Sequence, residues 1–382
     1  MQKKIIALAV AGLVSGAAFA QSNVTIYGVA DIGYNYAKSG DNRFSGLQDG
    51  GDVGLQGSRI GFRGEEALGN GLKAIFTVEF GLNLGAGEGT ANWSNTRQSY
   101  VGLAGNFGTV KFGRQYAPSG EWLGGTSVNG FTSVNFANYF LGNFATLNTG
   151  NGSRWNNSIG YESPNFSGFT FRGIYSFHPT QSSVRDSFSD ATTDGSRYAL
   201  AARYANGPVY LTAIYQAILT DDAINNDDGN KAWAIGGSYD FKVVKVFANY
   251  IREKDKRAIG STTYGFPTLN PTTGLLQQAA TTAYAKGDLK KTLFSLGAAI
   301  PVSSAGTVQI ELGQYKTDAS ETKSRGGSIG YKHALSKRTT AYTYVTRFSN
   351  QDNTAGANRA AAVVGVRGES QTSFAVGLNH NF

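Results

Sequence analysis

The last segment of the chain, residues 370–382 with the sequence SQTSFAVGLNHNF, alternates strictly between two sets of side chains. The members of one set are mostly large and apolar, and those of the other are small or polar: Phe374, Val376, Leu378, His380 and Phe382 against Ser373, Ala375, Gly377, Asn379 and Asn381. This period of two predicts a β-strand whose faces meet two different environments. The segment ends on an aromatic residue. We expect it to pair with the first strand and close a membrane barrel, with Phe382 at the membrane interface.

The first twenty residues have the pattern of a secretory signal. Lys3 and Lys4 precede an apolar run over residues 5–14, and Ala18-Phe19-Ala20 fits the small-x-small pattern of a cleavage site. We therefore expect residues 1–20 to be a signal peptide and residues 21–382 to form one barrel. An N-terminal membrane anchor is the alternative, but the apolar run is too short to span a bilayer. No other segment is long enough to span as a helix, which favours a barrel as the membrane fold.

Composition agrees with a strand-and-turn protein and excludes some functions. The chain has 51 glycines, 23 phenylalanines and 20 tyrosines but 7 prolines, which favours strands and turns over helices. It has no cysteine, so a disulfide framework and a cysteine nucleophile are excluded. The formal net charge is +8, but lysines and arginines are scattered along alternating segments instead of clustering on one surface. We therefore expect no nucleic-acid partner.

Short and long connections alternate along the chain. Seven pairs of alternating segments are each joined by a tight turn, at residues 69–71, 106–108, 164–168, 206–208, 242–243, 303–306 and 336–338. Longer polar spans, such as residues 37–57 and 255–288, separate these pairs. Tight turns on one side and long loops on the other are typical of outer-membrane barrels. The pattern predicts an all-β antiparallel barrel of about 16 strands around an aqueous lumen. A soluble sandwich or propeller is the alternative, but it would not sort its connections in this way.

Residues 117–153 form the first long span without a clear strand. The span contains several aromatic residues, which argue against disorder: Trp122, Phe131, Phe136, Tyr139, Phe140 and Phe144. A long loop with apolar anchors is normally functional, and we expect this one to fold into the lumen and narrow the pore. A cap on the outer surface or a contact between subunits remains the alternative.

Several motifs together resemble one family. The opening strand VTIYGVADIGY, the hairpin SRIGFRGEEALGNGLKA, the strand NFGTVKFGRQ and the terminal phenylalanine are similar to the trimeric general-diffusion porins of Gram-negative bacteria, in particular the beta-proteobacterial group. The resemblance covers essentially the whole mature chain. It implies a 16-stranded outer-membrane barrel, a homotrimer, an inward-folded third external loop, and an arginine cluster on the wall that faces this loop.

Counting from the tight turns places several charged residues at similar heights in the barrel. At ~3.3 Å per residue and a tilt of ~40°, these residues lie near or above the middle of the membrane. They are Arg59, Glu79, Arg97, Arg114 and Arg154. The resemblance implies that Arg59, Arg97 and Arg154 match the constriction arginines of the family and that Glu79 is their acidic partner.

Parity predicts which of these side chains point into the lumen. Ile60 and Phe62 are expected to face lipid, which points Arg59 inward, and the alternation of their own strands points Glu79 and Arg154 inward as well. Arg97 is ambiguous, because Val101 and Leu103 share its parity. Arg114 shares parity with Val110 and Phe112, so it faces a subunit interface unless a bulge reverses it. Glu121 is the only charged residue of the 117–153 span, and we include it in the expected constriction.

The expected function follows from the charge of guanidinium groups. They stay protonated at working pH, and several at one height give a fixed positive field that attracts anions and repels cations. In the alternative, each arginine is paired with Glu79, Asp31 or Glu66 and only braces the wall. We expect a passive outer-membrane channel for ions and small hydrophilic solutes, mildly anion-selective and homotrimeric, whose partners are outer-membrane lipid, lipopolysaccharide and small anions. We expect no cofactor and no metal site.

Three other functions are alternatives to a general diffusion channel. A substrate-specific channel is the nearest alternative, and saturable block by one solute would distinguish it. A barrel hydrolase would need a histidine, but His178, His333 and His380 lie far apart in the sequence, so we do not expect an enzyme. A binding-only adhesin role for the loops is the third alternative.

Overall fold

The computed structural model describes residues 23–85, 96–130, 153–177, 196–219, 229–255, 267–269, 276–278, 289–352, 366 and 368–382. The strands of its large antiparallel sheet are β1 (Asn23–Ser39), β2 (Asn42–Asp49), β3 (Arg59–Gly69), β4 (Leu72–Gly81), β5 (Thr96–Gly105), β6 (Gly108–Tyr116), β7 (Arg154–Glu162), β8 (Phe169–Ser176), β9 (Arg197–Asn206), β10 (Val209–Ile218), β11 (Asn230–Asp240), β12 (Lys245–Asp255), β15 (Leu289–Pro301), β16 (Gly306–Thr317), β17 (Ser324–Ala334), β18 (Thr339–Asn350) and β19 (Gln371–Asn381). A separate hairpin consists of β13 (Pro267–Leu269) and β14 (Leu276–Gln278).

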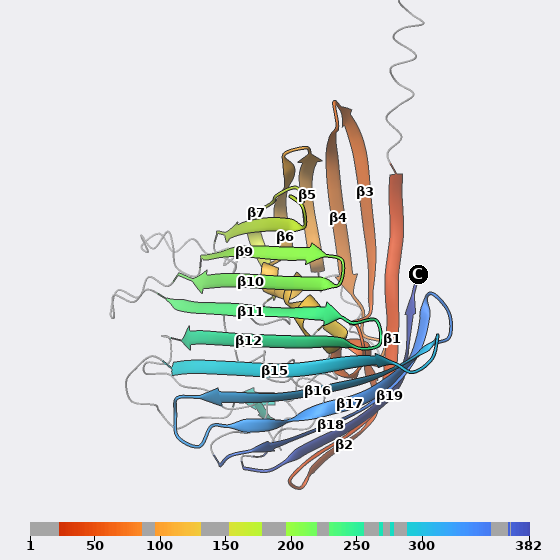
Figure 1. Ribbon diagram of the computed structural model, residues 1–382, viewed down its shortest axis with the longest axis vertical. Coiled ribbons are helices and arrows are strands. Elements are labelled where there is room, and N and C mark those ends of the chain that lie inside the picture. Colours follow the sequence, from red (N-terminus) through yellow and green to blue (C-terminus); the bar gives the residue numbers. More distant parts are fainter. Residues whose placement is uncertain are drawn as a thin grey trace, which may run out of the picture.

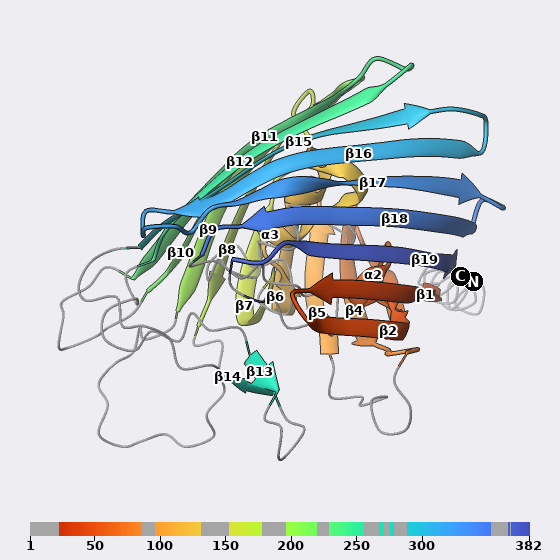
Figure 2. The ribbon, with the colours of Figure 1, turned by 90° about the horizontal axis from the view of Figure 1, so that it is seen from below.

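The large sheet closes on itself because its first and last strands pair. β1 lies antiparallel to β19 over residues 29–39 (Figure 1; Figure 2). At the end of this pairing, Gly28 N donates to Phe382 O at 3.0 Å, and Phe382 N donates to Gly28 O at 3.1 Å. The expected closure of the barrel by its last strand is therefore confirmed.

Two strand elements share one position in the wall. The second edge of β1 pairs with β3 over residues 23–29 and with β2 over residues 32–39. β2 and β3 are thus two halves of one wall strand, interrupted by residues 50–58, which include the short helix α2 (Gly50–Val53). The barrel accordingly has sixteen strand positions, as expected. The sequence indicated no strand within residues 37–57, and this was wrong for residues 37–39, which belong to β1, and for residues 42–49, which form β2.

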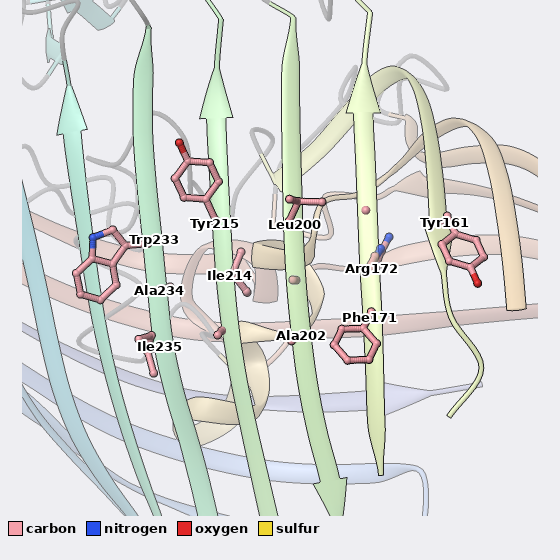
Figure 3. A pocket seen from close by; sticks show the side chains of 13 residues that line it. Tyr161, Phe171, Arg172, Leu200, Ala202, Ile214, Tyr215, Trp233, Ala234 and Ile235 are labelled. Carbon is pink, nitrogen blue, oxygen red and sulfur yellow. The ribbon is translucent and has the colours of Figure 1, made fainter. Parts of the chain in front are cut away.

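The two faces of the wall differ as the alternation predicted. Outward side chains are apolar and exposed, for example Leu200, Leu211 and Ile235, each more than half exposed. Part of this outer face has a hollow, whose lining includes Ala202 and Ala213 together with larger side chains such as Leu200 and Trp233 (Figure 3). Inward side chains include many buried polar groups, such as those of Asn249, Ser295 and Glu311. An apolar outside and a polar inside suit a barrel with lipid around it and water within.

All seven expected tight turns connect neighbouring strands. The turn between β3 and β4 shows why the sequence marks them: Asn70 has φ 50° and Gly71 has φ 76°. Positive φ at both central residues matches the right-handed twist of a hairpin, and Asn-Gly adopts it at little cost. Each register is then fixed, because the short turn allows one alignment of the flanking strands.

Residues 117–130 follow β6 and lie against the inner wall. They form α3 (Pro118–Glu121), η2 (Leu123–Thr126) and η3 (Val128–Gly130), which lie inside the ring of strands (Figure 1; Figure 2). Trp122 and Leu123 are almost fully buried in a cluster with inward residues of several strands, including Ile214 and Leu293. Ser127 Oγ donates to Glu311 on β16 at 2.9 Å. The remainder of the expected constriction loop, residues 131–152, lies outside the described residues. Among the described helices, none has the length and apolar character needed to cross a membrane.

Candidate pore constriction

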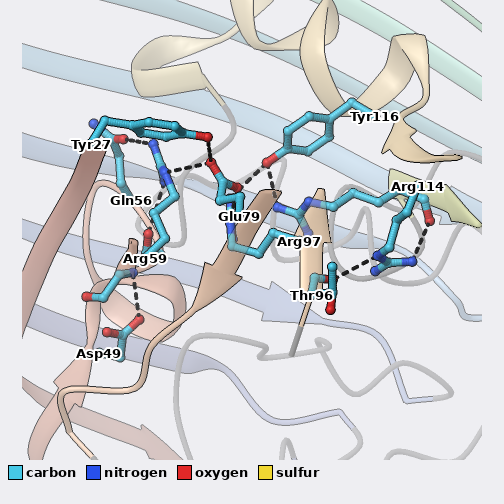
Figure 4. Close-up of polar contacts among 12 residues, drawn as sticks. Tyr27, Asp49, Gln56, Arg59, Glu79, Thr96, Arg97, Arg114 and Tyr116 are labelled. Atoms are coloured by element: carbon cyan, nitrogen blue, oxygen red, sulfur yellow. Dashed lines mark hydrogen bonds and ion pairs between the residues drawn. The ribbon is translucent and has the colours of Figure 1, made fainter. Parts of the chain in front are cut away.

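Glu79 on β4 is the centre of the predicted charged band. Its strand alternates, so Thr77 and Glu79 are buried on the inner face of the wall. Glu79 Oε1 lies 2.6 Å from Arg97 Nε, and Oε2 lies 3.5 Å from Arg59 Nε (Figure 4). Tyr27 on β1 donates its hydroxyl to the same carboxylate at 3.0 Å. One carboxylate therefore contacts two of the predicted arginines, whose own side chains are 16–20% exposed.

Arg59 is the first residue of β3, directly after residues 50–58. Its Nη2 donates to Gln56 Oε1 at 2.7 Å, and its Nη1 donates to the Gly57 carbonyl at 3.0 Å (Figure 4). Together with Glu79, these acceptors hold the guanidinium from three directions. The inward orientation predicted for Arg59 agrees with this contact set.

A bulge decides the orientation of Arg97, which parity left ambiguous. Along the β4–β5 ladder Glu79 pairs with Gln98, but the next residue, Phe80, pairs with Thr96. Arg97 is thus the extra residue of a β-bulge, a feature that redirects a side chain. Its guanidinium points to Glu79 and also donates from Nη2 to Tyr116 Oη at 2.8 Å.

Arg154, the first residue of β7, is held by an aromatic residue. Its Nη2 donates to Tyr116 Oη at 2.5 Å, and its guanidinium carbon lies 4.4 Å from the centroid of that ring. Within the described residues no carboxylate lies at ion-pair distance from Arg154. Tyr116 therefore links Arg154 to Arg97 and places two guanidiniums side by side.

Arg114 has a different role from the other arginines. Its Nε donates to the Thr96 carbonyl at 2.8 Å, and Nη1 bonds to Asn156 Oδ1 and, at 3.4 Å, to the Arg154 carbonyl (Figure 4). The β6–β7 register shifts between Gly113 and Gln115, so Arg114 itself lies at an irregularity. The side chain ties the beginnings of β5 and β7 together. In the described part of the chain it has no carboxylate partner.

Glu121 does not join the Arg59–Glu79–Arg97 cluster. Its Oε2 lies 2.5 Å from Nη1 of Arg172 on β8, and Arg172 Nη2 donates to the Tyr116 carbonyl at 2.6 Å. Burial alone would raise the pKa of Glu121. The positive charges of Arg172, Lys111 and Arg203 have the larger, opposite effect, so the pKa lies below its ordinary value. The pair fixes α3 against the wall next to the cluster.

Sequence reasoning missed Arg172, Arg203, Gln56 and Tyr116. Arg203 stacks 4.6 Å from the Trp122 ring, which anchors the inward segment to β9. The facing of Arg172 could have been found, because Phe169 and Phe171 are about half exposed on the outside and parity then places Arg172 inside. No local pattern indicated Gln56 or Tyr116.

The alternative in which carboxylates neutralise every arginine holds only in part. Glu79 pairs with Arg59 and Arg97, whereas Asp31 and Glu66 form no ion pair with the predicted arginines among the described residues. Asp31 instead accepts hydrogen bonds from neutral donors. Among the described residues, guanidiniums therefore outnumber the carboxylate that contacts them, and this set of charges is net positive.

The described histidines have ordinary partners. His333 bonds to Tyr331 Oη at 2.9 Å and His380 to Thr339 Oγ1 at 2.9 Å, while His178 lies outside the described residues. No group of three potential metal ligands occurs among the residues that the structure describes.

Comparisons with known proteins agree with this geometry. The family model described as Gram-negative porin matches residues 7–353. Outer membrane porin protein 32 of Delftia acidovorans is 34% identical, with all of both chains covered. An outer membrane porin of Bordetella pertussis is 31% identical over 96% of this chain and 99% of that protein. Among solved structures, the anion-selective porin from Comamonas acidovorans superposes on this chain with a TM-score of 0.72 and 28% sequence identity. The match covers 95% of this chain and 100% of the Comamonas chain. The chain therefore belongs to the Gram-negative porin family.

Proposed function

We propose that this porin is a passive, water-filled channel with a mild preference for anions, whose filter is formed by Arg59, Arg97 and Arg154 with Glu79. The protein is a multi-pass β-barrel of the Gram-negative outer membrane. Ions and small hydrophilic solutes diffuse through its lumen, and we infer no enzymatic step. In this proposal Arg114 and Glu121 border the filter and brace it.

The excess of guanidinium over carboxylate carries the proposal. Within the described part of the chain, Arg59 and Arg97 share one carboxylate, and Arg154 contacts a tyrosine and no acid. Guanidinium cannot be neutralised by crowding, so the cluster keeps its charge at any working pH. Two unit charges 4 Å apart interact by ~4 kcal/mol at an effective dielectric of 20, against ~1 kcal/mol in bulk water. A narrow pore beside such a cluster concentrates anions and still lets them leave.

The inward segment supports a constriction at the same level. Residues 117–130 lie against the inner face of the wall. Glu121 and the Tyr116 carbonyl both bind Arg172 beside the cluster. We propose that the whole 117–153 span is the constriction loop. The anion selectivity named for the Comamonas porin supports an anion preference here as well.

The remaining parts of the proposal rest on the resemblance of the sequence motifs to trimeric porins. We infer a homotrimer embedded in lipid and lipopolysaccharide. We also infer that residues 1–20 are removed as a signal peptide, which leaves a mature chain from Gln21. Small anions are the inferred ligands of the filter, and no cofactor takes part.

The test is the zero-current potential of the purified protein in a planar bilayer under a KCl gradient. An anion-selective potential, with conductance that appears in steps of three, is expected. A cation-selective potential would show that carboxylates dominate the filter. Folded protein without conductance would contradict the open channel, and saturable block by a single solute would indicate a substrate-specific channel instead.

A further inference from the structure

A second segment enters the lumen between β2 and β3. β1 pairs with β2 up to Ile32–Asp49 and with β3 from Val29–Arg59, so only Ala30 and Asp31 face the gap that residues 50–58 leave in the ladder. These nine residues, which we call the inner turn, leave the wall instead of continuing the strand. The Ser58 hydroxyl replaces the backbone partner that Asp31 lacks in this gap: Asp31 N donates to Ser58 Oγ, and Ser58 Oγ donates to Asp31 O, both at 3.0 Å.

The Asp31 carboxylate binds the inner turn to the wall. Oδ2 accepts from Leu55 N at 3.0 Å and from Gln56 N at 2.9 Å, which are both in the inner turn. Tyr342 on β18 donates to Oδ1 at 2.7 Å, and Asn379 on β19 donates to Oδ2 at 2.9 Å. Asp31 is fully buried, and every one of these donors is neutral. A carboxylate with several hydrogen bonds of this kind gives strong and directional fixation.

Packing around the carboxylate leaves no space for adjustment. A Cβ on Gly54 would lie 2.3 Å from Asp31 Oδ1 and 2.6 Å from the Tyr342 hydroxyl. A Cβ on Gly50 would lie 2.2 Å from Asp31 Cγ. Val53 is buried against Tyr342 and other inward residues of β18 and β19. The inner turn is thus a fitted element of the inner wall.

The other side of the inner turn contacts the arginine cluster. Gln56 Oε1 and the Gly57 carbonyl accept from Arg59, and a Cβ on Gly57 would lie 3.3 Å from Arg97 Nη1. The hydrogen bonds therefore run from β18 and β19 through Asp31 and the inner turn to Arg59 without interruption.

We propose that the inner turn is a second constriction element and that Asp31 is the positioning residue that fixes it, and with it Arg59, at the pore. The inference deepens the proposed channel function and depends on it. Asp31 itself is not a filter residue, because it is buried and acts through the backbone of residues 55 and 56.

Charge-neutral variants test the proposal, because replacing Asp31 would also change the charge of the lumen. In Gly54→Ala the new methyl group cannot fit beside Asp31, so the inner turn moves away from the wall and into the lumen. We expect a single-channel conductance below the spread of wild-type channels and a shifted Cl⁻/K⁺ permeability ratio. Gly46→Ala on β2 is the matched control, because its Cβ would lie 3.3 Å or more from a phenylalanine ring, and wild-type values are expected.

Tyr342→Phe provides an independent second variant. It removes one hydrogen bond to Asp31 and leaves the volume almost unchanged, so the inner turn becomes looser and open-channel current noise rises. Tyr344→Phe is its control: the hydroxyl of Tyr344, also inward on β18, binds Gln309 instead of Asp31. If Asp31 served only barrel stability, Tyr342→Phe would melt at a lower temperature while its folded channels kept the wild-type noise and permeability ratio.

The outcomes separate this inference from the proposed function. Wild-type protein without conductance or with cation selectivity would contradict the proposed function. An anion-selective wild type whose conductance, noise and permeability ratio are unchanged in folded Gly54→Ala and Tyr342→Phe would overturn the role of the inner turn. The inference is supported if these two variants change the channel and the two controls do not.

Discussion

Replacing Glu79 by glutamine removes the carboxylate that Arg59 and Arg97 share while keeping the shape of the side chain. The two ion pairs have N–O distances of 3.5 Å and 2.6 Å. After the substitution both guanidiniums keep their charge, and the constriction gains one net positive charge. We expect the channel to become more anion-selective.

The size of the effect can be worked from Coulomb's law. A permeating ion about 7 Å from the lost charge, in water, gains or loses about 0.6 kcal/mol, and screening at about 0.1 M salt reduces this to about 0.3 kcal/mol. The free energy of an anion falls by this amount and that of a cation rises by it. The Cl⁻/K⁺ permeability ratio should therefore rise about threefold in Glu79→Gln.

The assay is the zero-current potential of Glu79→Gln and wild type in the same KCl gradient. Glu65→Gln is the matched control, because Glu65 forms an ion pair with Lys73 in which both side chains are about half exposed. That variant should leave the ratio unchanged. A Glu79→Gln channel with the wild-type ratio, or with a ratio shifted toward cations, would refute the assignment of Glu79 and its arginines to the filter.

Arg154→Gln removes one positive charge, and the same reasoning predicts a Cl⁻/K⁺ permeability ratio about threefold lower, measured as a zero-current potential. An unchanged ratio would contradict the assignment of Arg154 to the filter. Tyr116→Phe takes away the hydroxyl that accepts from Arg97 and Arg154, so thermal unfolding of the barrel should show a loss of about 1 kcal/mol, with noisier open-channel current. Because the pKa of Glu121 is lowered, its pair with Arg172 contributes fully above about pH 4.3 and is lost as the pH falls through the lower folded value. Because this pair holds α3 against the wall, acid-induced channel closures should begin only below about pH 4. Glu121→Gln should show no such onset, and closures that begin near neutral pH in the wild type would contradict the role given to the Glu121–Arg172 pair.

Local patterns in the sequence were sufficient for the architecture. Alternation fixes which side chains face lipid, and short turns such as Asn70-Gly71 fix register, so the sixteen-position barrel and the facing of Glu79 follow from neighbours along the chain. The alternating sequence of residues 370–382 was enough to predict that the last strand pairs with the first, because an unpaired strand edge cannot remain in lipid. Alternation along the strands likewise predicts inward orientations for Arg59 and Arg154.

Tertiary structure decided how the filter is assembled. Parity cannot place Arg97, because the bulge that redirects it exists only relative to β4. The partner of Glu121 is on β8, and Tyr342 and Asp31, which are 311 residues apart in sequence, meet only when the barrel closes. The sequence alone therefore determined the barrel, because strand alternation and turns are local. The charges that meet in its lumen depended on closure, because a hydrogen bond or an ion pair forms only between groups that the complete fold brings within about 3 Å.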